Sequence, residues 1–169
     1  ERVQNGSLNV TADGRKPVTI LQRMKAVRKR TGLVTTATAT HATPAGLVTN
    51  VSKREDQKEV AFQYLERGVD VVLGGGATYF SESLVSAYKK VGYAHVTNRA
   101  QLLAHRGAGP LLGLFSKNYI PMEVDRLNRK ELAAVTPSLA EMTQVALASL
   151  QGGSEGFFLM VEGGRIDHA

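Results

Sequence analysis

The sequence of 169 residues has the length of one domain, and 43% hydrophobic with 21% charged residues is the composition of a folded protein with a buried core. It contains no cysteine, which excludes disulfide frameworks, zinc fingers and thiolate chemistry, and it has no apolar run long enough to cross a membrane. The net charge of +6 favours anionic partners, from small phosphate esters to nucleic acid, without choosing among them.

The N-terminal part combines an irregular segment with a basic helix. Residues 1–16 carry turn signals and are expected to be irregular, with a short strand at 7–10. Hydrophobic residues at helical spacing predict a helix over 17–31 that is capped by Gly32. Its other face is either solvated or binds an anion or nucleic acid. This face carries Arg23, Lys25, Arg28, Lys29 and Arg30.

Strands and helices alternate along the rest of the chain. The hydrophobic pattern predicts strands at 33–38, 69–73, 111–115 and 157–161. It predicts helices at 44–51, 55–67, 81–90 and 137–150, the last with a Ser138–Glu141 capping box. No assignment follows for residues 116–135. This alternation predicts an α/β fold with a mostly parallel sheet and helices on both faces.

Polar motifs follow three of these strands, at 40–44, 74–76 and 162–168. Ligands of parallel sheets bind beyond the carboxyl ends of the strands, so the chemistry is expected there. Glu162 follows an apolar strand directly, and Asp167 and His168 follow within one loop. This spacing is compatible with a metal site, with a structural salt bridge or loop cap, and with acid–base catalysis without a metal.

The other two motifs have two interpretations each. His41 and Thr43 could be ligands, but Thr43 before Pro44 is also an ordinary arrangement for a helix N-cap. The three glycines at 74–76 could cradle a phosphate, although they lack the lysine and the spacing of a Walker loop. A tight turn between a strand and a helix is the simpler interpretation of these glycines.

Four motifs, in this order, resemble those of the alkaline phosphatases, which are metal-dependent phosphomonoesterases. They are Thr40-His41-Ala42-Thr43-Pro44-Ala45, Leu73-Gly74-Gly75-Gly76-Ala77, Leu111-Leu112-Gly113-Leu114-Phe115 and the segment 156–168. The resemblance runs from about residue 17 to the last residue. It implies an alkaline-phosphatase-like but incomplete fold, in which residues 1–169 are a single partial domain from the interior of a longer protein.

The resemblance also implies a set of site residues and two metals. Thr43 and Glu162 fall on positions that bind Mg²⁺ in the family, and Asp167 falls on a ligand of one catalytic Zn²⁺. Arg54 falls on the arginine that binds the substrate phosphate. His41 and His168 fall on positions near the magnesium and the phosphate, so we expect them to be neighbours.

The implied reaction is the hydrolysis of small phosphate monoesters through a phosphoserine intermediate. No Asp-Ser pair occurs in this sequence, so the nucleophile, the bridging aspartate and the remaining zinc ligands are expected outside it, and the chain alone is expected to be inactive. The resemblance further implies a homodimer, no specific nucleic-acid partner, and a periplasmic or extracellular location.

Two other functions remain open from the sequence. One is a phosphodiesterase or sulfatase of the same superfamily. The other is a basic, non-catalytic module that binds nucleic acid through residues 23–30.

Overall fold

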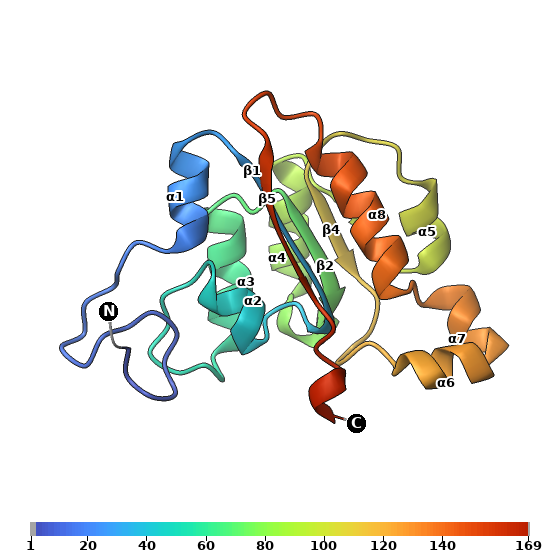
Figure 1. The fold of residues 1–169 in the computed structure, drawn as a ribbon, viewed down its shortest axis with the longest axis horizontal. Coiled ribbons are helices and arrows are strands. Elements are labelled where there is room, and N and C mark those ends of the chain that lie inside the picture. The colour runs from blue at the N-terminus through green and yellow to red at the C-terminus, as the bar shows by residue number, and fades with distance from the viewer. Residues whose placement is uncertain (1–2, 169) are drawn as a thin grey trace.

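The structure is a computed structural model that describes residues 3–168, in which five parallel strands form one sheet in the order β3-β4-β2-β1-β5 (Figure 1). The strands are β1 (Arg30–Thr38), β2 (Val71–Gly75), β3 (Ala94–Val96), β4 (Leu111–Leu114) and β5 (Phe157–Glu162). The helices are α1 (Ile20–Ala26), α2 (Ala42–Gly46), α3 (Gln57–Glu66), α4 (Glu82–Lys90), α5 (Arg99–Ala104), α6 (Glu123–Asn128), α7 (Lys130–Val135) and α8 (Leu139–Leu150). Two short 3₁₀ helices are η1 (Ala77–Tyr79) and η2 (Ile166–His168).

Helices cover both faces of the sheet, as Figure 1 shows. Alternate residues of β1 point to the two sides: Leu33 belongs to a hydrophobic cluster with Leu21 and Tyr64, from α1 and α3. The next residue, Val34, belongs to a second cluster with Met142, from α8. The predicted fold class is therefore confirmed. None of the helices within residues 3–168 is long and apolar enough to span a membrane.

Most predicted elements are present with shifted ends. Ser81 and Ser138 cap α4 and α8 as the sequence indicates. The segment 116–135, which had no assignment, contains α6 and α7. The sequence pattern missed β3 and α5, because three strand residues with His95 in the middle give too weak a hydrophobic signal.

The predicted helix over 17–31 is wrong at both ends. It begins at Ile20, because the Thr19 side chain accepts a hydrogen bond from the Gln22 amide and Gln22 in turn caps the Thr19 amide. It ends at Ala26, and Arg28 has a φ of +59° that leaves the helical path. The following residues gain more from the sheet, where Arg30 onwards pairs with β5.

Gly32 does not cap a helix but lies inside β1, paired with Val71 and Leu159. A Cβ at this position would lie 2.8 Å from side-chain atoms of both Leu150 and Leu159. The glycine therefore lets helix α8 and strand β5 pack directly against the backbone of β1.

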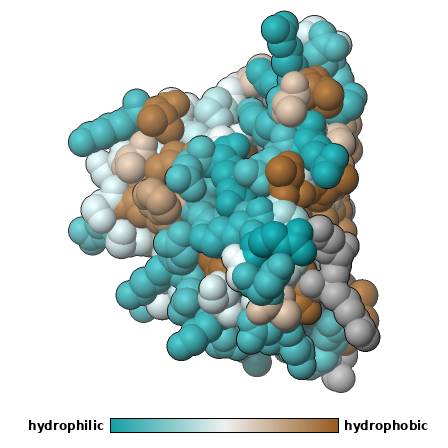
Figure 2. Space-filling view, turned by 90° about the vertical axis from the view of Figure 1, so that its left-hand side faces the viewer, coloured by the Kyte–Doolittle hydropathy of each residue, from teal (hydrophilic) through white to brown (hydrophobic). Residues whose placement is uncertain are grey.

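The predicted strand at 7–10 is also wrong. Within the described residues, the N-terminal segment forms only single bridges, between Leu8 and Val51 and between Val3 and Thr11. Figure 2, which looks at the side of the molecule that carries this segment and α1 to α3, shows a largely hydrophilic surface with separate hydrophobic patches.

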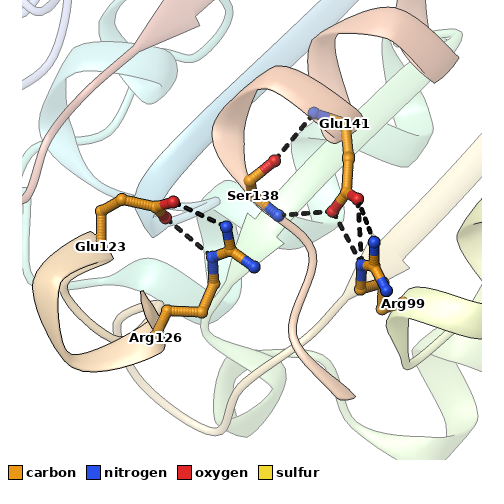
Figure 3. Close-up of polar contacts among 5 residues, drawn as sticks. All are labelled: Arg99, Glu123, Arg126, Ser138 and Glu141. Carbon is orange, nitrogen blue, oxygen red and sulfur yellow. Dashed lines mark hydrogen bonds and ion pairs between the residues drawn. The ribbon is translucent and has the colours of Figure 1, made fainter. Parts of the chain in front are cut away.

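Glu141 connects two helices while it caps one of them (Figure 3). Its carboxylate accepts a hydrogen bond from the Ser138 amide at 2.9 Å and binds the Arg99 guanidinium of α5, with N–O distances of 2.5 and 3.0 Å. The hydrogen bond from Arg99 is the main cause that lowers the pKa of Glu141. The nearby pair Glu123–Arg126 lies within α6 alone.

The three glycines at 74–76 let the loop 116–119 pack directly onto the end of β2. A Cβ at Gly75 would lie 1.9 Å from the carbonyl oxygen of Asn118, and Gly76 has a φ of +86°. The Gly76 amide donates to that same carbonyl at 2.6 Å, and the next two amides donate to other carbonyls of the loop. These donors are already used, which favours a tight turn over a phosphate cradle.

We expect Glu141→Ala to lower the free energy of unfolding by about 1–2 kcal/mol, because it removes a helix cap together with a partly exposed ion pair. The matched control Glu123→Ala removes only a pair within one helix and should cost less than about 0.5 kcal/mol. Since the pKa of Glu141 is lowered from 4.5, its contribution is complete above pH 4.5 and is lost as the pH falls further. Urea denaturation at pH 7 and at acidic pH measures both effects; equal losses for the two variants would contradict the double role.

We expect Gly75→Ala to lower the free energy of unfolding by at least about 2 kcal/mol, because a backbone carbonyl occupies the space that the methyl group needs. The control is Gly46→Ala at the end of α2, where no atom lies within 4 Å of the added Cβ. That change should leave stability unchanged or raise it slightly. Thermal unfolding of both variants measures these changes in stability. A tolerated alanine at position 75 would show that the loop 116–119 is not packed against β2 as described.

Candidate active site

Parallel pairing of β1 with β5 brings the first two polar groups together. The register runs from Arg30 opposite Phe157 to Thr35 opposite Glu162. At this last pair the Thr35 hydroxyl donates a hydrogen bond of 2.6 Å to Oε2 of Glu162. Oε1 accepts no hydrogen bond from the described part of the chain, so the half-buried carboxylate is oriented but keeps one oxygen free for a ligand.

The loop after β5 folds back onto the end of β1. The Arg165 amide donates a hydrogen bond of 3.2 Å to the Thr36 hydroxyl. A Cβ at Gly164 would lie 3.0 Å from Ala37 and 3.2 Å from the Glu162 carboxylate, which is tighter than an ordinary contact, so the glycine favours this close approach. The chain then continues into η2, which carries the last polar groups of the motif.

Five charged or titratable side chains gather at this edge of the sheet, and we call them the His41 cluster: His41, Arg54, Glu162, Asp167 and His168. The rings of the two histidines are neighbours, with centroids 6.4 Å apart. Burial is the main cause that lowers the pKa of His41, and the positive charges of Arg54 and His168 act in the same direction. The carboxylates of Glu162 and Asp167 act in the opposite direction and raise it.

The remaining predicted site residue, Thr43, lies on the same helix as His41. His41 is the N-cap of α2 and Thr43 is its second residue, so the N-cap interpretation of Thr43 is wrong. The exposed Thr43 hydroxyl makes no hydrogen bond with any residue of 3–168, and none joins it to Glu162 or Asp167. Arg54, in the loop between α2 and α3, is also exposed. The structure thus places the rings of His41 and His168 next to each other, with Thr43 on the helix that His41 caps. Arg54, Glu162 and Asp167 are linked to His41 by the effect of their charges on its pKa.

Sequence reasoning missed the side chains that hold this cluster in place. The sequence around Thr35 does not indicate a role in the site, because its hydrogen-bond partner Glu162 lies 127 residues away. Tyr119 falls in the segment without an assignment, yet its ring lies 4.8 Å from that of His168. Nη1 of Arg165 is 3.1 Å from Nδ1 of His168. Because Arg165 lies inside the motif 162–168, the sequence already indicated that it belongs near the site.

The donor set of this edge fits magnesium better than zinc. Glu162 and Thr43 offer oxygen atoms, which Mg²⁺ prefers together with water. Within residues 3–168, no group of three or more histidine, aspartate or glutamate side chains is arranged to hold a metal ion. Asp167 is one of about three protein ligands that a catalytic zinc needs, so a complete zinc site requires further ligands.

An apolar groove of about 1180 Å³ lies next to the cluster, between α8, the segment 120–124 and the end of β5. Val161 and Ile166 line it and are 43% and 79% exposed. Because its lining is mostly apolar, it offers little to a phosphate group. A phosphate is therefore better accommodated at the His41 cluster than in this groove.

The basic segment 23–30 is tied into the fold. Lys25 forms an ion pair of 2.9 Å with Asp70, and the side chains of Lys29 and Arg30 donate to backbone carbonyls. Three of the five cations are thus bound within the chain, and the last of them lies in β1, so they do not form one helical face. These contacts weaken the case for a nucleic-acid-binding helix.

Comparison with known proteins gives a match along nearly the whole chain. The profile of the family described as alkaline phosphatase matches residues 2–169. Alkaline phosphatase 3 of Bacillus subtilis (strain 168) is 36% identical over 177 residues, which cover 99% of this chain and 37% of the relative. The repressible alkaline phosphatase of Saccharomyces cerevisiae is 35% identical over 200 residues, which cover 98% of this chain and 34% of the relative.

The fold of the chain is also similar to that of solved alkaline phosphatases. The crystal structure of Thermus thermophilus alkaline phosphatase superposes with a TM-score of 0.89 at 40% identity, over 98% of this chain and 36% of that one. The chain therefore spans little more than a third of these relatives and contains only part of their fold. With a match over nearly its whole length in both sequence and structure, this chain belongs to the alkaline phosphatase family.

Proposed function

We propose that the protein hydrolyses phosphate monoesters and that the His41 cluster is part of its active site. The observation that carries the proposal is the gathering of Arg54, two carboxylates and two histidines at the carboxyl edge of a parallel sheet, where ligands of such sheets bind. Membership of the alkaline phosphatase family supports the same reaction. Because the chain spans about 37% of its Bacillus relative, the complete activity belongs to a longer protein.

In this proposal Arg54 binds the phosphate. Its side chain is exposed, and its positive charge contributes to the lowered pKa of His41. We therefore propose that it is available at the edge where the substrate would lie. An arginine presents two N–H groups to two phosphate oxygens at once, which a lysine ammonium does not do. His41 and His168 flank the same space, and we propose that they adjust phosphate binding without carrying out the chemistry.

Glu162 and Thr43 would hold magnesium, and Asp167 would supply one ligand to zinc. When bound, such ions supply positive charge that stabilises the phosphoryl group and the oxygen atoms that enter and leave. Thr35 contributes by holding the Glu162 carboxylate through one oxygen, so that the other oxygen keeps a defined direction. This arrangement lowers the entropy that the side chain would lose on binding a cation.

The attacking group of the proposed reaction is a serine outside these residues, which would be phosphorylated by the ester and then released by water. The remaining zinc ligands would also come from outside, so the 169 residues alone are proposed to be inactive. The homodimer and the periplasmic or extracellular location stay predictions from the family resemblance.

We expect Arg54→Ala, in the longer protein, to lower the affinity for inorganic phosphate by about 10- to 100-fold, the usual value of hydrogen bonds between charged groups. Arg54→Lys should restore only part of it. The matched control Lys53→Ala removes an adjacent exposed cation and should change the affinity less than about threefold, the range of surface charge effects. Competitive inhibition by phosphate measures the affinity, and urea denaturation checks folding. An Arg54 variant that loses stability but keeps phosphate affinity would make this arginine structural.

We expect the 169-residue chain, supplied with Zn²⁺ and Mg²⁺, to leave p-nitrophenyl phosphate unhydrolysed. A version extended on both sides to the length of its relatives should hydrolyse it and lose this activity when EDTA removes the metals. Turnover by the short chain that EDTA abolishes would contradict the missing-nucleophile argument.

The same extended protein separates the alternative functions. A phosphomonoesterase should prefer p-nitrophenyl phosphate to bis-p-nitrophenyl phosphate and to p-nitrophenyl sulfate. The reverse order would favour a phosphodiesterase or a sulfatase. Binding to DNA or RNA that falls steeply with rising salt, in the absence of any hydrolysis, would favour the nucleic-acid module.

A further inference from the structure

Tyr119 is an aromatic side chain at the edge of the His41 cluster that the proposed chemistry leaves without a role. It is 38% exposed and lies in the loop between β4 and α6. Its ring centroid lies 4.8 Å from that of His168 and 6.2 Å from that of His41. The guanidinium carbon of Arg165 lies 5.2 Å from the centre of the same ring. One ring thus contacts or faces three cationic or titratable side chains from two other segments.

The backbone around Tyr119 is held on both sides of this residue. The Ile120 amide donates to the Thr36 carbonyl at 3.0 Å, which ties the loop to the end of β1. On the other side of the tyrosine, the Asn118 carbonyl accepts the Gly76 amide at 2.6 Å. Because the backbone is fixed on both sides, the tyrosine ring has little freedom beyond its two side-chain torsions.

The side chains that face Tyr119 are held less firmly. His168 ends a single 3₁₀ turn and is exposed, and its amide donates to the Arg165 carbonyl at 3.1 Å. Its Nδ1 lies 3.1 Å from Nη1 of Arg165, so the two side chains hold each other. Nε of Arg165 is buried and has no hydrogen-bond partner within residues 3–168. The Tyr119 ring is therefore a neighbour that both side chains share.

We propose that Tyr119 is a positioning residue, whose ring holds His168 and Arg165 in the orientation that the proposed phosphate site requires. Through a tilted aromatic contact with His168 and a cation–π contact with Arg165, the uncharged tyrosine ring restricts both groups. Side chains that are already ordered lose less entropy when a ligand binds. The inference rests on the proposed function, because it assigns the ordered groups to the binding of a phosphate ester.

The test compares three variants of the longer protein. Tyr119→Ala removes the ring, and Tyr119→Phe keeps the ring and removes the hydroxyl. The control Phe62→Ala removes an aromatic ring on α3 that is 49% exposed and is not a member of the His41 cluster. The measurements are KM and kcat for p-nitrophenyl phosphate, the inhibition constant of inorganic phosphate, and the NMR signals of ¹³C-labelled histidine rings.

Tyr119→Ala should raise both KM and the phosphate inhibition constant about fivefold, the equivalent of about 1 kcal/mol for one cation–π contact, while kcat changes less than about twofold. It should also shift the ring signal of His168, because the ring current of the tyrosine is lost. Tyr119→Phe should restore all of these values, and Phe62→Ala should leave them unchanged.

Unchanged KM and inhibition constants in Tyr119→Ala would overturn the inference, as would a loss that Tyr119→Phe does not restore. If the unaltered protein hydrolyses no phosphate ester, the proposed function fails, and the NMR signals still test whether Tyr119 positions His168. A His168 signal that is the same with and without the Tyr119 ring would then overturn the positioning role. A signal that moves in Tyr119→Ala and returns in Tyr119→Phe would support it.

Discussion

The register between β1 and β5 is the constraint on which the candidate site depends. Thr35 and Glu162 are 127 residues apart in the chain, and parallel pairing places them opposite each other where β5 ends, three residues before the end of β1. Because successive side chains of a strand point to opposite faces, a shift by one residue would turn Glu162 to the other side of the sheet. The same shift would break the hydrogen bond between the Arg165 amide and the Thr36 hydroxyl. The loop that leads to Asp167 and His168 would then no longer lie at the end of β1.

Close packing at glycines makes this register possible. Gly32 lets α8 and β5 approach the backbone of β1, and Gly164 lets the loop after β5 turn beside the Glu162 carboxylate. Gly75 allows the loop that carries Tyr119 to pack on the end of β2. In each case a backbone or side-chain atom of another segment fills the space of the missing Cβ, so these glycines position the site through packing more than through turn geometry.

The electrostatics of the edge agree with a binding site for an anion and a cation together. Cationic and anionic groups act on His41 with opposite signs, while burial keeps its pKa low and favours the neutral imidazole. By contrast, the apolar groove beside the cluster is lined mainly by hydrophobic residues, and two of its charged residues, Glu123 and Arg126, pair with each other.

The sequence by itself determined the α/β class, most helices and strands, and the residue types at the three strand ends, because hydrophobic period, caps and motifs are local properties. It misplaced the helix over 17–31, since pairing of Arg30 onwards with β5 outweighs local helix preference and turns Gly32 into a strand residue. Only the tertiary structure decided which side chains meet. The contacts of Thr35 and Tyr119 with the His41 cluster join segments far apart in the chain, and such contacts depend on strand order and register, which no local pattern encodes.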